Sequence, residues 1–239
     1  SALGKSEFNK KIDITFIFPK EDSKEFRERC DAIGIKYFLF SFTKISRNWI
    51  NILKYLILFP FEVMKLANFL KKHSFDIVHA SGGSQQFKGI IAAKIAKIKV
   101  VWEMNDTYTP FVFRNIYFLL SRLVNCLVFG SNRTKEYYKN ITPKNKKNFL
   151  IHSPVNVNFY DPLFNFPIEE FIKRNIDEKK IIIGTVANVS PVKDLKLLLK
   201  IVKELSLYSN KIIFIVVGSV HNTQRNYYEN LLDDINREG

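Results

Sequence analysis

The sequence predicts an α/β protein whose sheets are mainly parallel. Short apolar runs rich in Val, Ile and Phe alternate with longer amphipathic segments along the chain of 239 residues. The short apolar runs are typical of buried parallel strands, and the amphipathic segments are typical of the helices that cover them. A regular strand–helix alternation indicates βαβ units with helices on both faces of a sheet.

The pattern predicts eight strands and seven helices, in the following order. The strands are expected at residues 12–18, 36–42, 76–80, 100–103, 126–130, 148–152, 181–186 and 212–217. The helices are expected at residues 20–33, 47–73, 85–96, 113–123, 133–140, 192–206 and 222–238, where apolar residues recur every three or four positions. Ligands of such sheets bind beyond the carboxyl ends of the strands, so the loops that follow the strands are the candidate sites.

The alternation stops between residues 153 and 177. This segment contains Pro154, Pro162 and Pro167 and has no convincing strand, so a domain boundary is expected there. We expect a first domain at 1–160, a linker at 161–178 and the beginning of a second domain at 179–239. The chain has no initiator Met and no strand after its last predicted helix, so it is expected to be a fragment of a longer protein.

Several classes of site are disfavoured by the composition. The sequence has no G-x-G-x-x-G and no Walker A motif, which argues against standard dinucleotide and P-loop sites. Cys30 and Cys126 lie far apart, and the four His residues show no metal-ligand spacing. We therefore expect no metal site, no cofactor and no disulfide framework, and a reducing compartment. No signal peptide is visible.

The formal net charge of +14 indicates an anionic partner. Nucleic acid, anionic lipid and nucleotide phosphates all have the required charge. The alternative is that Lys residues are simply spread over solvated faces. The densest basic segment, 133–147, lacks the interleaved aromatic residues of a single-strand binder.

The predicted helix 47–73 is long, apolar and flanked by lysines. Pro60 is expected to kink or divide it. Residues 49–64 include Lys54, Pro60 and Glu62, so they do not form a bilayer span. Two interpretations remain: an interfacial helix on an anionic membrane, or a core helix with a charged outer face.

A strand, a turn and a helix follow one another at residues 181–206. Asn188 and Ser190 lie in the turn, and Lys193 lies where the helix begins. A cation at a helix N-terminus opposes the helix dipole, but it would act together with the free N–H groups if a phosphate bound there. The alternative is an ordinary surface lysine.

These segments together resemble the retaining nucleotide-sugar glycosyltransferases of family 4, which have the GT-B fold. The turn at 187–194, ANVSPVKD, resembles the family's donor turn, and Lys193 matches its diphosphate-binding Lys. Asn188 stands where the family has an Arg and cannot supply that charge. The resemblance implies a diphosphate site formed by Lys193, Asn188 and Ser190.

The first domain resembles the acceptor-side domain of the family. Residues 76–83, DIVHASGG, resemble its D-I-V-H strand and the loop that contains Gly82 and Gly83. Asn105 and Asp106 stand where the family often has an acceptor-side His. Ser131 matches the end of a third strand. The resemblance thus makes Asn105 and Asp106 the catalytic candidates, and Gly82, Gly83 and Ser131 residues of the cleft loops.

The rest of the chain extends the resemblance. Residues 151–159, IHSPVNVNF, resemble the segment that enters the linker, and Gly218 ends a strand, IFIVVG, that resembles the second domain's next strand. Gly218 is therefore a fourth cleft-loop candidate. The family's first strand is expected before Ser1, and its Glu-x7-Glu motif beyond Gly239. The resemblance implies a GT-B-like chain: a Rossmann-like parallel-sheet domain and the beginning of a second one.

The activity that the resemblance implies is transfer of a sugar from a nucleotide-diphosphate sugar to a hydroxyl group. Lys193 and the nearby amides would stabilise the charge that develops on the leaving diphosphate. Asp106 or Asn105 would orient the acceptor, although Asp106 could instead cap a helix near Thr107. His79 is either a packed core residue or a catalytic one. Alone, the fragment is expected to show little or no turnover.

Two rival functions are also consistent with the sequence. One is a nucleotide-sugar 2-epimerase of the same fold, and the other is a non-catalytic basic module that binds membrane or nucleic acid. For the transferase, the expected partners are a nucleotide-diphosphate sugar, a glycan or lipid-linked acceptor from surface polysaccharide synthesis and an anionic membrane surface, but not nucleic acid. The expected location is the cytoplasm, at the inner face of the cell membrane.

Overall fold

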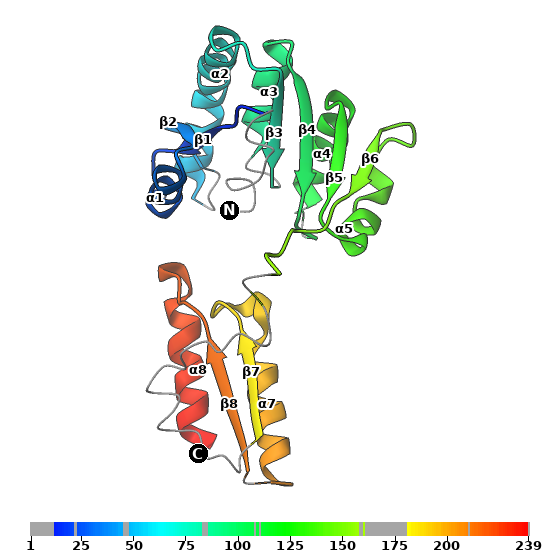
Figure 1. The fold of residues 1–239 in the computed structure, drawn as a ribbon. Coiled ribbons are helices and arrows are strands. Elements are labelled where there is room, and N and C mark those ends of the chain that lie inside the picture. Colours follow the sequence, from blue (N-terminus) through cyan, green and yellow to red (C-terminus); the bar gives the residue numbers. More distant parts are fainter. Residues whose placement is uncertain are drawn as a thin grey trace. The chain divides into compact units, whose positions relative to one another are not determined.

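The computed structural model describes residues 12–21, 23–44, 48–82, 86–107, 109, 111–157, 160, 181–209 and 211–238 (Figure 1). The chain divides into two compact units, Ser1–Asp161 and Pro162–Gly239. The predicted linker and Gly83 lie outside the described residues. The predicted domain bounds and the roles of the two domains stay predictions.

The first unit is an α/β unit in which all strand pairs of the described residues are parallel, as predicted. Its elements are β1 (Thr15–Pro19), α1 (Lys24–Ile33), β2 (Lys36–Phe40), α2 (Trp49–Lys72), β3 (Ile77–Ser81), α3 (Phe87–Ile95), β4 (Lys99–Met104), α4 (Phe111–Leu123), β5 (Cys126–Phe129), α5 (Asn132–Tyr137), η4 (Lys139–Ile141) and β6 (Asn148–Leu150). The strands form two sheets, β1-β2 and β3-β4-β5-β6. The prediction located the elements correctly but misplaced several of their ends by one to four residues.

The core of the first unit lies between the four-stranded sheet and its helices. Alternate residues of a strand face the same side of a sheet, and in β4 these are the buried Val100, Trp102 and Met104. The helices α2, α3 and α4 pack side by side (Figure 1). The opposite side of β3 is exposed, and His79 lies there, where its Nε2 is 3.1 Å from Glu103 Oε2. The interpretation of His79 as a packed core residue is therefore wrong.

Pro60 does not divide α2, which was one of the two effects predicted for it. The helix runs without a break from Trp49 to Lys72 with Pro60 inside it. Proline removes the N–H that would bond to the carbonyl of Leu56. Pro60 is exposed, so water can satisfy that carbonyl on the solvent side of the helix.

The second unit is a smaller α/β unit with two parallel strands. Its elements are β7 (Ile181–Val186), η5 (Pro191–Lys193), α7 (Leu195–Ser206), β8 (Ile212–Val217), η6 (Asn222–Gln224) and α8 (Arg225–Glu238). Val189, Leu195 and Leu231 form its small buried core. The ammonium of Lys196 lies 2.7 Å from Asp234 Oδ2 and links α7 to α8. The predicted helices at 192–206 and 222–238 each begin with a 3-10 turn instead of an α-helical one.

Candidate active site

The candidate donor loop lies at the carboxyl end of β7. The Lys193 amide donates to the Ser190 carbonyl at 3.0 Å, and the Asp194 amide donates to the Pro191 carbonyl at 3.1 Å. Asp194 then adopts a left-handed conformation with φ of 46°, which a non-glycine residue rarely adopts, and α7 begins after it. Lys193 therefore lies in a tight 3-10 turn just before the helix, and not in its first turn as predicted.

Lys193 is placed to bind an anion. Its side chain is exposed, and no described residue forms a hydrogen bond or ion pair with its ammonium. The first N–H groups of a helix have no intrahelical acceptor, so those of Leu195 and Lys196 are also available at this end of α7. A cation next to such amides is a suitable arrangement for a phosphate group.

The end of β8 supports this loop through a very close backbone approach at Gly218. A Cβ atom on Gly218 would lie 2.0 Å from the carbonyl oxygen of Ala187, so only glycine fits. Beyond it, Val189 and Val220 form a parallel bridge. The Ser219 hydroxyl donates to Asn188 Oδ1 at 3.1 Å, which leaves the Asn188 NH2 group as a donor for a ligand. Gly218 thus has a structural role next to the loop.

The candidate acceptor side lies at the carboxyl ends of β3, β4 and β5. Gly82 follows β3 with φ of 102°, a conformation that favours glycine. Its amide donates to the Glu103 carbonyl at 3.0 Å, and the indole of Trp102 donates to the Gly82 carbonyl at 2.9 Å. Both the amide and the carbonyl of Gly82 are therefore held by hydrogen bonds to residues of β4.

Asn105 and Asp106 follow β4, and both are exposed. A Cβ atom on Gly130 would lie 2.8 Å from Asn105 Oδ1, so the Asn105 side chain lies directly against the end of β5. The helix α4 begins at Phe111, so Asp106 does not cap it. The structure thus brings Asn105 close to Gly130, the neighbour of Ser131.

Ser131 has a clear structural role as the N-cap of α5. Its Oγ accepts from the Thr134 amide at 3.1 Å and lies 2.9 Å from the Thr134 hydroxyl. The Gly130 carbonyl lies 3.1 Å from Nδ1 of His152, which follows β6. Ser131 therefore stabilises the start of α5 just after the carboxyl end of β5.

Sequence reasoning missed a buried hydroxyl network that anchors the loop after β4. The hydroxyls of Thr109 and Tyr138 lie 2.9 Å apart, and the Thr109 amide donates to the Tyr137 hydroxyl at 2.9 Å. The rings of Tyr138 and Tyr117 stack with centroids 5.6 Å apart. Burial raises the pKa of Tyr117 and of Tyr138. No motif in the sequence marks this network, because its members come from separate elements of the chain.

A second missed cluster lies between α2, α3 and the loop after β2. The ammonium of Lys88 forms an ion pair with Glu62 and donates to the Thr43 carbonyl at 2.7 Å. The same ammonium lies 4.3 Å from the ring centroid of Tyr55. Glu62 also accepts from the Thr43 amide at 2.9 Å. This buried ion pair positions the loop at the carboxyl end of β2.

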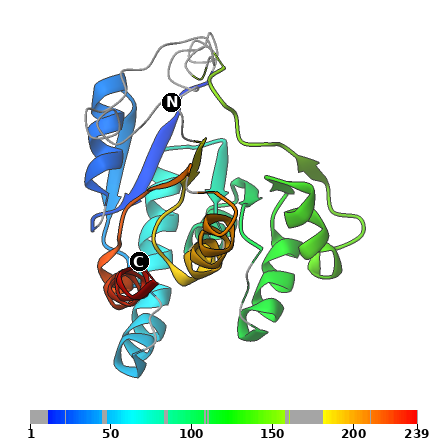
Figure 2. The same ribbon diagram turned by 90° about the horizontal axis from the view of Figure 1, so that it is seen from below.

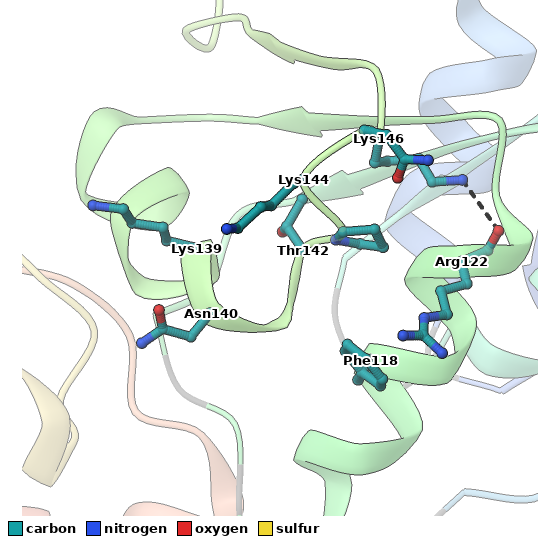
Figure 3. A pocket seen from close by; sticks show the side chains of 9 residues that line it. Phe118, Arg122, Lys139, Asn140, Thr142, Lys144 and Lys146 are labelled. Carbon is teal, nitrogen blue, oxygen red and sulfur yellow. Dashed lines mark hydrogen bonds between the residues drawn. The ribbon is translucent and has the colours of Figure 1, made fainter.

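A basic pocket of about 850 Å³ lies at the opposite edge of the sheet, before β5 and β6 (Figure 3). The ammonium of Lys146 donates to the carbonyls of Arg122 and Val124 at 3.1 and 2.6 Å, and burial lowers its pKa. The Arg122 guanidinium lies 4.0 Å from the ring centroid of Phe118. These cations therefore have internal partners, and the pocket lies apart from the candidate site.

Within the described part of the chain, no group of three or more His, Cys, Asp or Glu side chains could hold a metal ion. In the same residues, no helix has the length and apolar character that crossing a membrane requires.

Solved structures with a similar fold bear on the fold of this chain. HepE of Anabaena, solved in complex with UDP and glucose, matches with a TM-score of 0.71 and 15% identity, over 95% of this chain and 67% of that one. MurG of Acinetobacter baumannii matches with a TM-score of 0.51 and 15% identity, over 95% and 65%. A putative UDP-N-acetylglucosamine 2-epimerase from Listeria monocytogenes matches with a TM-score of 0.55 and 11% identity, over 91% and 65%. The GT-B-like fold is thereby confirmed.

The family follows from the sequence itself. The model of the family described as Glycosyltransferase Family 4 matches residues 7–159, and the chain belongs to this family, as the resemblance indicated. A Campylobacter jejuni protein, N,N'-diacetylbacillosaminyl-diphospho-undecaprenol alpha-1,3-N-acetylgalactosaminyltransferase, is 25% identical over 196 residues. The match covers 73% of this chain and 48% of that protein, so the chain spans about half the length of this relative.

Proposed function

We propose that the protein is a retaining glycosyltransferase that moves a hexose-type sugar from a nucleotide-diphosphate sugar to a hydroxyl group. Membership of family 4 supports this reaction class. The observation that carries the proposal is the exposed Lys193 ammonium beside the free amides of α7. This arrangement has the charge and geometry that a diphosphate requires.

In this proposal the second unit holds the donor. Lys193, the Asn188 NH2 group, the Ser190 hydroxyl and the first amides of α7 bind the diphosphate. As the anomeric bond breaks, negative charge grows on the leaving diphosphate, and placed positive charge stabilises that state more than the ground state. Asn188 adds a hydrogen bond but no charge, so Lys193 supplies the positive charge in this turn.

The first unit orients the acceptor. Asn105 and Asp106 are exposed at the carboxyl end of β4, and Asp106 is the candidate general base. The Campylobacter jejuni relative is named for action on a diphospho-undecaprenol compound, which supports a lipid-linked acceptor here. We place the protein in the cytoplasm, at the inner face of the cell membrane where such acceptors are reached. The proposed reaction uses no metal.

A ligand screen of the full-length protein tests the proposal. Melting temperature is measured with UDP, GDP, ADP and their sugars, because a ligand that binds only the native state raises it by mass action. One nucleotide series should raise it, and sugar transfer from that donor should then be measured for Lys193→Ala. We expect kcat/KM to fall at least roughly 30-fold, which corresponds to a loss of about 2 kcal/mol in transition-state stabilisation.

Lys200→Ala is the matched control, since Lys200 is an exposed lysine in α7, the helix that follows the Lys193 turn, and the variant removes the same charge. It should keep wild-type kcat/KM. Equal activity of Lys193→Ala and Lys200→Ala would contradict the assignment of the donor turn.

The second candidate is a nucleotide-sugar 2-epimerase. It is favoured by the fold likeness to the Listeria monocytogenes protein, and epimerisation also needs proton-transfer groups such as the paired His79 and Glu103. The test is to incubate the protein with UDP-sugars without any acceptor. Release of a free epimerised UDP-sugar would favour this candidate over the transferase.

A further inference from the structure

We propose that Lys88 is a positioning residue for the acceptor, because it holds the loops after β2 and β4 in one arrangement. This inference rests on the proposed function and adds a residue that acts on the acceptor through these loops. Lys88 lies in the first turn of α3, at the edge where β3 ends. Its side chain is 6% exposed, and a lysine is almost never buried to this extent unless it is paired.

The ion pair of Lys88 and Glu62 holds the loop after β2 at a single residue, Thr43. The ammonium of Lys88 donates to the Thr43 carbonyl at 2.7 Å and to the Thr43 hydroxyl at 3.0 Å. The Glu62 carboxylate accepts from the amide and the hydroxyl of Thr43 at 2.9 and 3.2 Å. All the polar groups of Thr43 are thus bound by the pair, so a shift of this loop would break several hydrogen bonds at once.

Three aromatic rings surround the ammonium of Lys88. Their centroids lie 4.3 Å away for Tyr55, 5.6 Å for Phe42 and 6.0 Å for Phe59. Tyr55 and Phe59 belong to α2, and Phe42 belongs to the loop after β2. The face of an aromatic ring attracts a cation, and the rings also shield the ion pair from water, which strengthens its hydrogen bonds. The ammonium is therefore held in one position between α2, α3 and this loop.

Stability alone is a poor explanation for this buried pair. Replacement of both partners of a buried ion pair by apolar residues often leaves a protein equally stable or more stable. What an apolar contact does not supply is direction, because charge-assisted hydrogen bonds require particular distances and angles. Here these directional bonds converge on the backbone and hydroxyl of Thr43. The pair is therefore suited to fix the place of a loop.

The start of α3 also reaches the loop after β4. Phe87 precedes Lys88 and is 4% exposed, and its ring meets that of Tyr117 edge-on, with centroids 5.5 Å apart. Tyr117 stacks on Tyr138, whose hydroxyl lies 2.9 Å from that of Thr109. Thr109 belongs to the loop between β4 and α4, which also carries Asp106. Packed side chains thus connect the first turn of α3 to the loop of the acceptor-side candidates.

The helix α3 is the common support of the two loops. It contacts both α2 and α4, and Figure 2 shows these two helices apart from each other, α2 in light blue to cyan and α4 in green. A displacement of α3 would change the position of the loop after β2 relative to that of Asn105 and Asp106. Lys88 prevents this displacement because its hydrogen bonds tie α3 to Thr43.

Acceptor kinetics of the full-length protein test the inference. The donor is the nucleotide-sugar that raises the melting temperature most, and the acceptor probe is a diphospho-undecaprenol-linked sugar. Lys88→Met should raise the KM for this acceptor at least about tenfold, because the loops no longer hold one arrangement, and should leave the Kd for nucleoside diphosphate unchanged. Loss of folded protein alone would instead lower the apparent kcat and leave this KM unchanged.

Two further variants separate positioning from stability. Lys88→Met/Glu62→Gln leaves no unpaired charge and serves where Lys88→Met does not fold, but it lacks the ammonium, so its KM for the acceptor should stay raised. Leu70→Ala is the matched control, since Leu70 is a buried side chain of the same helix as Glu62 and its loss destabilises the same core. It should keep the wild-type KM. A wild-type KM in the double variant, or an equal rise in Leu70→Ala, would overturn the inference.

Hydrogen exchange separates this inference from the proposed function, because it needs no acceptor. In the double variant, exchange of the Thr43 and Thr109 amides should rise at least about tenfold more than in Leu70→Ala, since both loops lose their support. A rise at Thr43 alone would overturn the inference whatever the activity. No sugar transfer by the wild type, together with faster exchange at both amides in the double variant, would contradict the proposed function and leave the connection between the loops supported.

Discussion

Replacement of Lys88 by Met tests the buried ion pair that positions the loop after β2. The side chains of Lys88 and Glu62 are 6% and 13% exposed. Among the described residues, Lys88→Met leaves the buried Glu62 carboxylate with the Thr43 amide and hydroxyl as its donors. Removal of one partner of a buried ion pair destabilises a protein by about 3–5 kcal/mol, and we expect a loss in that range.

The double variant Lys88→Met/Glu62→Gln measures how much of this loss comes from the unpaired charge. The amide that Glu62→Gln introduces can still accept a hydrogen bond from the Thr43 amide but has no charge to desolvate. We expect the double variant to be more stable than Lys88→Met by about 1–3 kcal/mol.

The assay is urea unfolding followed by tryptophan fluorescence. Both tryptophans, Trp49 and Trp102, belong to the first unit, so the signal reports on that unit alone. Equal stability of the single and double variants, or a loss below about 1 kcal/mol for Lys88→Met, would refute the reasoning.

Three further predictions concern single residues. Gly218→Ala should destabilise the second unit by about 1–3 kcal/mol, because its Cβ would meet the Ala187 carbonyl, and unchanged hydrogen exchange in β8 would contradict this. Tyr138→Phe should cost about 1–3 kcal/mol in urea unfolding, because the buried Thr109 hydroxyl loses its partner, and wild-type stability would count against the network. Burial raises the pKa of Tyr55 to about 12, so the folded state holds this proton more tightly than the unfolded state. The contribution of the protonated Tyr55 to the free energy of unfolding is present below pH 10 and is lost as the pH rises toward 12. Tyr55→Phe should reduce the fall in the free energy of unfolding between pH 10 and pH 12, measured by urea unfolding. An unchanged dependence on pH would exclude Tyr55 as its source.

The order of elements could be predicted from the sequence because strands and helices differ in period and in residue type. The β-branched run at 181–186 and the leucines after Lys193 show this directly, and both became the expected elements. What local pattern could not predict is governed by tertiary context. Pro60 stays inside a continuous helix because its face is exposed, and the left-handed Asp194 moves Lys193 ahead of α7.

Only part of the candidate site could be predicted from the sequence. Lys193 could be selected because it follows a strand, where ligands of parallel sheets bind, and the resemblance to family 4 singled out Asn105 and Asp106. The residues that hold these loops could not be selected in that way. Lys88 and its partner Thr43 are 45 positions apart, and the need for glycine at position 218 arises from the backbone of Ala187 on another strand end.

Binding of a nucleoside diphosphate to the donor turn is the most direct test of the central claim. Isothermal titration calorimetry of the full-length protein should compare the wild type, Lys193→Ala and Lys200→Ala with the nucleotide that stabilises it best. Loss of a charge-assisted hydrogen bond costs about 1.5–3 kcal/mol, so Kd should rise roughly 10- to 150-fold in Lys193→Ala and stay unchanged in Lys200→Ala. An unchanged Kd for Lys193→Ala would contradict the account.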